Sequence, residues 1–133
     1  MSMPKEQGTP GITGAPPVVV ERVYDHPTVG DGLRLFVDRL WPRGLRKDAF
    51  HFDDWARDLA PSTDLRHWYS HDVSAFSEFR ERYVHELESP TGRKAVSRVQ
   101  ELAHGRPIVL LTATKDLRHS HAEVLGEYLR NQS

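Results

Sequence analysis

The chain has 133 residues, with 18 Lys and Arg against 19 Asp and Glu, so its formal net charge is -1. This length suits one domain with a single core, and the balanced charge excludes a whole-protein field that would favour nucleic acid or an anionic membrane. The lack of cysteine excludes disulfide scaffolds, zinc-thiolate sites, iron-sulfur clusters and thiol nucleophiles.

The first 17 residues are rich in Gly, Pro, Thr and Ser and carry almost no large apolar residue. Such a segment cannot bury enough surface to offset chain entropy, so we expect a disordered tail over residues 1–17 and one domain over residues 18–131. The N-terminus lacks the charged-then-apolar pattern of a secretory signal, and no apolar stretch reaches the roughly 20 residues needed to cross a bilayer. We therefore expect a cytoplasmic protein without a membrane partner.

Two strands are predicted near the start of the domain, over residues 18–24 and 33–37, from their β-branched and apolar residues. The turn formers of residues 25–32 join them. The pattern over residues 46–60 is ambiguous, because it combines helical spacing of apolar residues with a short alternation typical of a strand end. We favour a short helix there.

Three helices are predicted in the middle of the chain. Ser62 is a suitable N-cap for a helical turn. Apolar residues at three- and four-residue spacing predict a second helix over residues 73–87, which closes before Pro90. Thr91 can cap the third helix, and Gly105 is a natural end for it.

The last two predicted elements are a strand and a helix. The unbroken apolar run of residues 108–111 is typical of a strand covered on both faces. Ser120 and Glu123 have the spacing of a capping box, in which each side chain satisfies a backbone N–H group of the other residue. A helix should therefore begin near His121 and run to Asn131. The succession of strands and helices predicts an α/β fold, a single compact domain whose small, largely parallel sheet is covered by helices.

A dense polar motif directly follows the second predicted strand and reads Asp-Arg-Leu-Trp-Pro-Arg-Gly over residues 38–44. Two guanidinium groups, a carboxylate and an indole in so short a segment indicate a built site, because Arg binds carboxylates and phosphates in bidentate fashion. The last predicted strand also runs into polar residues, at 112–116. Ligands of such sheets bind beyond the carboxyl ends of the strands, so we expect both segments at one site.

With this motif, the chain resembles the YeaO-like branch of the domain-of-unknown-function family 488 over residues 22–129. The similarity also rests on shorter strings, which are Arg22-Val23-Tyr24-Asp25, Asp31-Gly32, Leu59-Ala60-Pro61-Ser62, Leu110-Leu111, Lys115-Asp116 and His121-Ala122. The resemblance implies a compact, single-domain, mainly bacterial or archaeal protein without an established activity. The sequence departs from the family at Ser120, where relatives are expected to carry Asn.

We expect a pocket for a small anionic ligand, such as a phosphorylated or carboxylated metabolite, at the ends of these strands. Arg39 and Arg43 would capture the anion, helped by the positive N-terminal end of the last helix. The structural alternative is that both pair with Asp25, Asp31 or Asp38 and hold loops together. The predicted ligand-binding residues are Arg39, Trp41, Arg43, Thr112 and Lys115.

An enzymatic version of this site assigns proton transfer to His121. The charged form of a His is disfavoured at a helix N-terminus, which suits a general base. Asp38 or Asp116 would orient the ring, and the Arg pair would clamp a substrate for hydrolysis or group transfer. The alternative is a structural hydrogen bond from His121 that ties a loop to the sheet. We expect no cofactor and no metal, since the pair His67 and His71 lacks the Glu of a zincin motif.

A competing hypothesis from a different class is a non-catalytic interaction module. The segment Trp41-Pro42-Arg43 would then serve as an exposed anchor for a protein or nucleic-acid partner. The balanced charge disfavours nucleic acid. Salt-sensitive binding would identify it, because phosphate contacts release counterions.

Overall fold

The computed structural model describes residues 17–25 and 32–132. In these residues, four parallel strands form one sheet in the order β1-β4-β2-β3. Their bounds are Val18–Arg22 for β1, Leu33–Phe36 for β2, Asp54–Trp55 for β3 and Ile108–Thr112 for β4. The predicted tail, except its last residue Pro17, and most of the predicted turn at 25–32 lie outside the described residues.

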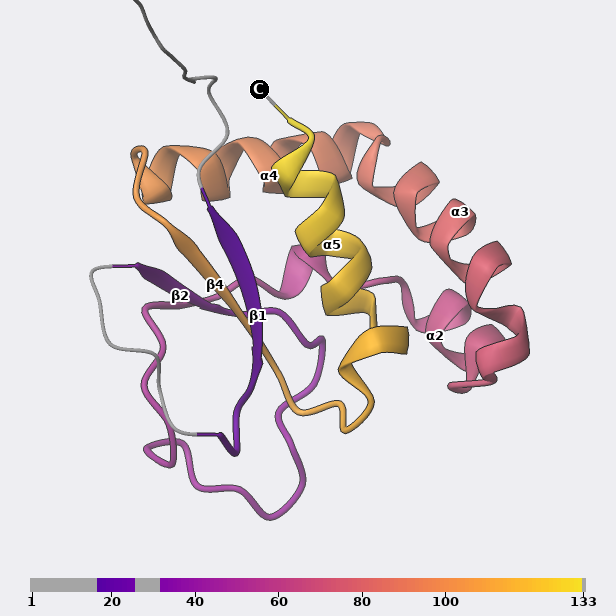
Figure 1. Ribbon diagram of the computed structural model, residues 1–133, viewed down its shortest axis with the longest axis horizontal. Helices are drawn as coiled ribbons and strands as arrows, with labels where there is room; N and C mark the ends of the chain where they lie inside the picture. The colour runs from indigo at the N-terminus through magenta and orange to yellow at the C-terminus, as the bar shows by residue number, and fades with distance from the viewer. Residues whose placement is uncertain (1–16, 26–31, 133) are drawn as a thin grey trace, which may run out of the picture.

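In the part of the chain that the structure describes, four α-helices accompany the sheet and confirm the predicted α/β class (Figure 1). They are α2 at Thr63–Tyr69, α3 at Phe76–Leu87, α4 at Pro90–Ala103 and α5 at His121–Arg130. Three short 3-10 turns are η1 at Arg57–Leu59, η2 at Val73–Ala75 and η3 at Leu117–His119. Within the described residues, no helix has both the length and the apolar character that a membrane-spanning segment requires.

The predicted core strand is β4, and all five of its residues are buried. It lies between β1 and β2 and pairs in parallel with both, so that Leu110 stands beside Val20 on one side and Leu35 on the other. A strand in this position is covered on both faces, which explains why its sequence is apolar without alternation.

The short helix predicted over residues 46–60 is wrong. That segment contains the two-residue strand β3 and the turn η1 instead. The backbone N–H groups of Asp53 and Ala56 donate to the carbonyls of Arg34 and Phe36, at 2.7 and 2.8 Å, and thereby add this stretch to the edge of β2. Burial of its aromatic side chains against the sheet outweighs their helical spacing.

The predicted helix boundaries are mostly confirmed. Ser62 caps α2, since its Oγ accepts a hydrogen bond from Leu65 N at 3.1 Å. The predicted cap Thr91 is wrong, because Ser89 caps α4 and Pro90 occupies its first turn. Pro suits that position, where its missing N–H group is not needed. The predicted stop at Gly105 agrees with the end of α4 at Ala103, and Gly105 has a φ of 83°.

The capping box at the start of α5 is only half formed. Ser120 Oγ accepts from Glu123 N at 3.2 Å, as predicted. The backbone N–H group of Ser120 donates to Leu117 O instead of the Glu123 side chain. The turn η3 supplies that nearer acceptor, so the Glu123 carboxylate is not needed for capping.

The two faces of the sheet are covered differently. Leu35 and Leu110 face the main core, to which all four α-helices contribute. Their neighbours Phe36 and Leu111 face the opposite way, as alternate strand residues must. The chain from the end of β2 through β3 covers this second face with an aromatic cluster, defined as Trp41, Phe50, Phe52 and Trp55 around Phe36.

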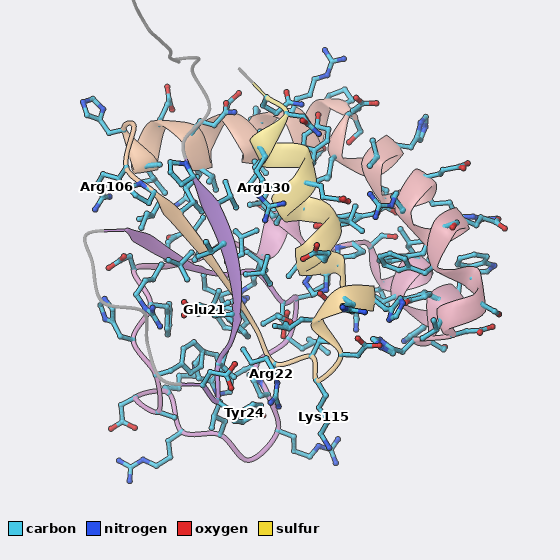
Figure 2. The ribbon with its side chains drawn as sticks, viewed as in Figure 1. Glu21, Arg22, Tyr24, Arg106, Lys115 and Arg130 are labelled. Atoms are coloured by element: carbon cyan, nitrogen blue, oxygen red, sulfur yellow. The ribbon has the colours of Figure 1, made fainter. Side chains whose placement is uncertain are left out.

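The outer strand β1 is protected at its amino end by α5. Arg130 Nε donates to Val18 O at 3.0 Å and so occupies a carbonyl that an edge strand would leave open. Figure 2 shows Arg130 at this end of β1, whereas Arg22 and Lys115 lie at the opposite end, where the strands terminate. That carboxyl edge carries the residues considered next.

Candidate functional site

The carboxyl ends of β2 and β4 form the point at which the chain changes sides of the sheet. The two strands are neighbours. After β2 the chain passes to the face of the aromatic cluster, and after β4 it passes through η3 to α5 on the other face. Connections that diverge in this way leave a crevice between adjacent strand ends, where α/β proteins commonly bind ligands.

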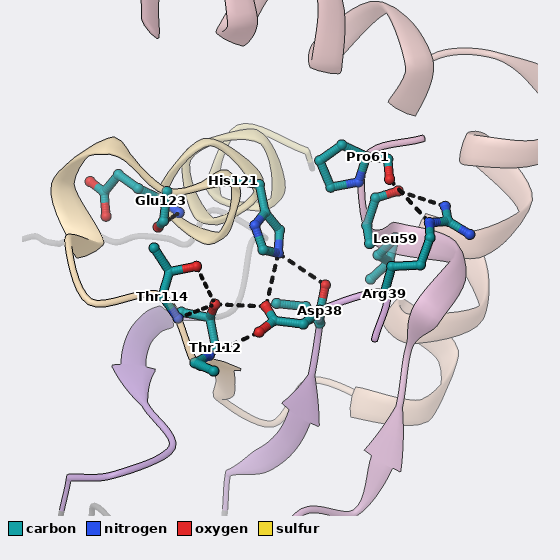
Figure 3. Close-up of polar contacts among 12 residues, drawn as sticks. Asp38, Arg39, Leu59, Pro61, Thr112, Thr114, His121 and Glu123 are labelled. Carbon is teal, nitrogen blue, oxygen red and sulfur yellow. Dashed lines mark hydrogen bonds and ion pairs between the residues drawn. The ribbon is translucent and has the colours of Figure 1, made fainter. Parts of the chain in front are cut away.

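Asp38 lies at this point and joins the ends of the two strands (Figure 3). Its Oδ1 accepts from Thr112 Oγ1 at 2.6 Å, and its Oδ2 accepts from the backbone N–H of Ala113 at 2.9 Å. Thr112 is fully buried and its hydroxyl also contacts Thr114 Oγ1 at 3.1 Å. Two predicted site residues, Asp38 and Thr112, are therefore in direct contact although 74 positions separate them.

His121 completes the cluster from the first turn of α5. Its Nε2 lies 3.0 Å from Val37 O and 3.2 Å from Asp38 Oδ1. Both neighbours are acceptors, so Nε2 carries the proton and donates to them. Among the described residues, none forms a hydrogen bond with Nδ1. The predicted contact between His121 and Asp38 is present, and with Thr112 these residues form what we call the Asp38 cluster.

The Asp38 cluster favours the ionised carboxylate. Burial raises the pKa of Asp38. The hydrogen bond from His121, the His121 charge, and the hydrogen bonds from Thr112 and Ala113 lower this pKa, and together they outweigh the effect of burial. The net pKa lies below the usual value of 3.8. The Asp38 and His121 side chains are only 16% and 12% exposed, so this is a largely buried contact between a carboxylate and an imidazole, and its acceptors are used within the protein.

Arg39 turns away from the Asp38 cluster, as Figure 3 shows. Its Nε donates to Pro61 O and its Nη2 to Ala60 O, each at 3.1 Å. These bonds hold the segment before α2 against the motif. Arg39 is thus engaged with loop carbonyls. The structural alternative predicted that Arg39 pairs with the carboxylate of Asp25, Asp31 or Asp38. Asp38 instead bonds Thr112, and Asp31 lies outside the described residues.

Trp41 packs inward, and Arg43 is exposed. The Trp41 ring stacks on Phe50 with centroids 5.2 Å apart, and its Nε1 donates to Leu45 O at 2.6 Å. The peptide bond before Pro42 is trans, as is every described peptide bond. The motif therefore divides its side chains between the interior and the surface.

Asp116 does not orient His121. Its Oδ2 lies 2.7 Å from His119 Nδ1 and 3.5 Å from His71 Nε2. The hydrogen bond from His119 lowers the pKa of Asp116 below 3.8. Asp116, the residue before η3, thus joins the start of this turn to the turn after α2. No group of three or more potential ligands within the described residues is arranged to hold a metal ion. Lys115, beside Asp116, is exposed.

Two residues that support the site were not among the predicted site residues. Trp55 Nε1 donates to Asp38 O at 2.7 Å, which ties β3 to the Asp38 cluster. Tyr83 is completely buried, and its hydroxyl donates to Leu59 O. Burial, with smaller contributions from Glu86 and Asp38, raises the pKa of Tyr83 well above its usual value. Helical or alternating spacing identifies such residues as buried, but it carries no signal for the partners of their polar atoms.

Comparisons with known proteins give a family without an assigned activity. Residues 17–133 match the family described as the inactive DUF488-N3 subclade. The uncharacterised protein Rv3073c of Mycobacterium tuberculosis is 39% identical over 115 residues, which cover 86% of this chain and 95% of the relative. The uncharacterised protein YeaO of Escherichia coli is 38% identical over 111 residues, covering 84% and 95%. No solved structure gives a significant match. The chain therefore belongs to the DUF488 family, in the subclade described as inactive.

Proposed function

We propose that this protein binds a small anionic ligand at the carboxyl edge of its sheet without transforming it. The observation that carries the proposal is the crevice position between β2 and β4, where the chain diverges to opposite faces. The segments leaving these strands carry the exposed cations Arg43 and Lys115. No described carboxylate lies within ion-pair distance of either. Both can therefore contact an anion without first leaving a partner.

Binding without turnover follows from how fully the Asp38 cluster is engaged. Each carboxylate oxygen of Asp38 already accepts a hydrogen bond, and the Nε2 proton of His121 faces two acceptors. A general base needs an available lone pair within reach of the substrate proton, and His121 could offer only Nδ1. The description of the family as inactive supports the same conclusion. In this proposal the Asp38 cluster is the rigid floor of the site.

The interaction module is the second candidate, in a changed form. Trp41 is packed in the aromatic cluster and is not the exposed anchor that the hypothesis required. Leu40, beside it, is 65% exposed. In this candidate, a protein partner contacts Leu40 together with the exposed Arg43 of the same motif.

A thermal-shift series tests the anion site. Phosphate, sulfate, nucleotides, sugar phosphates and carboxylic acids are added to the parent, to Arg43→Ala and to Lys115→Ala. We expect at least one anion to raise the melting temperature of the parent and to lose most of this effect in both variants, because binding to the folded state stabilises it by mass action. Lys47→Ala is the matched control, an exposed cation in the same loop as Arg43.

Two results would contradict the proposal. One is a panel in which no anion shifts the melting temperature of the parent. The other is a shift that persists in both variants, because the anion would then bind elsewhere. A Leu40→Ser variant that loses a protein partner while keeping the anion response would support the second candidate as a separate function.

A further inference from the structure

A hollow of about 350 Å³ lies at the β3 edge of the sheet, outside the predicted site. It is formed by β3, η1 and α4, and its lining residues are Trp55, Ala56, Arg57, Asp58, Leu59, Ala95, Arg98 and Val99. None of the residues predicted for anion binding or catalysis lines it. Its volume falls at the small end of the range for small-molecule sites, which is roughly 300–1,000 Å³.

Arg57 is held over this hollow by an aromatic ring. Its guanidinium carbon lies 3.8 Å from the centroid of the Trp55 ring. Stacking uses the face of the guanidinium and leaves its in-plane N–H groups free to donate. No described carboxylate lies within ion-pair distance of Arg57. A planar donor is therefore pre-oriented at the rim of the hollow.

Arg98 brings a second guanidinium to the hollow from α4. Its Nη1 and Nη2 donate to the two oxygens of Asp54, at 2.8 and 3.1 Å. The Arg98 side chain is 57% exposed, and ion pairs at such positions are weak. A ligand carboxylate can therefore compete with Asp54 for Arg98 or share the guanidinium with it.

The floor of the hollow is apolar. Leu59 and Val99 are each 1% exposed, and Ala56 is 5% exposed. Ala95 and Trp55 supply the partly exposed apolar surface of the lining. Two guanidinium groups and one carboxylate, that of Asp58, line the hollow, so the lining itself carries one net positive charge. Such a lining suits one negative charge on an apolar body and disfavours a multiply charged phosphate.

We infer that this hollow, between Arg57 stacked on Trp55 and Arg98 on α4, binds a small monocarboxylate with an apolar or aromatic body. The carboxylate lies between the two guanidinium groups, and the apolar body lies against the partly exposed Ala95 and Trp55. This site is separate from the proposed anion site and does not depend on it. The two are physically linked, because the Trp55 indole that supports Arg57 also donates to Asp38 O.

The test uses benzoate and hexanoate as probes on the full chain, with binding followed by two-dimensional 15N–1H NMR and isothermal titration calorimetry. We expect benzoate to shift the indole N–H signal of Trp55, identified with Trp55→Phe, and the amide signals of Ala95 and Val99. Arg57→Ala and Arg98→Ala should each weaken binding about tenfold, and Asp54→Asn should strengthen it severalfold because it frees Arg98.

Arg93→Ala is the matched control, since Arg93 is another exposed Arg of α4 and lies outside the hollow. It should leave the affinity unchanged. Three results would overturn the inference. The first is that no NMR signal shifts at about 10 mM probe, a concentration well above the dissociation constant of even a millimolar site. The second is an unchanged affinity in both Arg57→Ala and Arg98→Ala, and the third is that the shifted signals are confined to the surroundings of Arg43 and Lys115. The last result would place the carboxylate at the proposed anion site, so the two proposals can fail independently.

Discussion

The Asp38 cluster and the Asp54–Arg98 pair each join an acidic residue to a basic one, yet they differ in surroundings. Asp38 and His121 are 16% and 12% exposed, and their polar contacts are made with buried strand ends. Asp54 and Arg98 are 26% and 57% exposed. The first contact is completed by the backbone and by Thr112, whereas water can replace either partner of the second.

This difference separates structural from binding roles. A buried charge without its partner is strongly destabilising, so the Asp38 cluster must stay intact for the fold. An exposed pair contributes little to stability, so its groups can change partners when a ligand arrives. The charged residues suited to binding are thus the ones that the fold needs least.

The largest expected effect is that of Asp38→Ala. The change leaves Thr112, the Ala113 N–H group and His121 without their common acceptor, and breaking a buried pair costs about 3 kcal/mol or more of unfolding free energy. Urea unfolding followed by circular dichroism measures it. A loss below about 1 kcal/mol would show that the cluster is not structural.

A smaller effect is expected for Arg39→Ala. Two hydrogen bonds from its guanidinium to the carbonyls of Pro61 and Ala60 are lost, which should cost about 2 kcal/mol, as charge-assisted hydrogen bonds do. The matched variant Arg43→Ala removes an exposed Arg of the same motif and should stay within about 0.5 kcal/mol of the parent. Equal losses in the two variants would contradict the division of the motif between interior and surface.

The next smaller effect is expected in the pH dependence of the unfolding free energy, to which Asp38 contributes. The pKa of Asp38 is lower in the folded than in the unfolded state, so its contribution is present above pH 3.8 and is lost as the pH falls through the folded pKa. Asp116 acts with the same sign. Asp38→Asn should therefore flatten the acid limb of the stability curve, and Asp116→Asn should flatten it less, because Asp116 is solvent-exposed. Unfolding free energies measured between pH 2 and pH 6, at intervals of about half a pH unit, distinguish the two variants.

The smallest effect is expected for Arg98→Ala. Removing an exposed ion pair should change the unfolding free energy by less than about 1 kcal/mol. Asp54→Asn should behave alike, and a double-mutant cycle of the two gives their coupling directly. A coupling energy above about 2 kcal/mol would mean that the Asp54–Arg98 pair stabilises the fold. The two pairs would then not differ in role as described above.

Local features of the fold were predictable because their causes lie within a few residues. The apolar run of β4 and the caps Ser62 and Ser120 were recognisable from neighbouring residues alone. Prediction failed for β3, whose residues join the sheet only because β2 offers them a free edge. It also failed at the start of α4, where both Ser89 and Thr91 are acceptable caps and the tight corner with α3 selects Ser89. A Cβ atom at Gly92 would lie 2.3 Å from Glu86 O, which shows how closely the two helices meet.

The sequence by itself determined the α/β class, most of the helices and strands, the family, and the grouping of polar residues at two strand ends. Only the tertiary structure decided which of those residues meet. It joined Asp38 to Thr112 and His121, turned Arg39 to the carbonyls before α2, and gave Asp116 to His119. The physical reason is that spacing along the chain defines the face of an element, whereas contacts across some 70 positions depend on strand order and on which side of the sheet each connection takes.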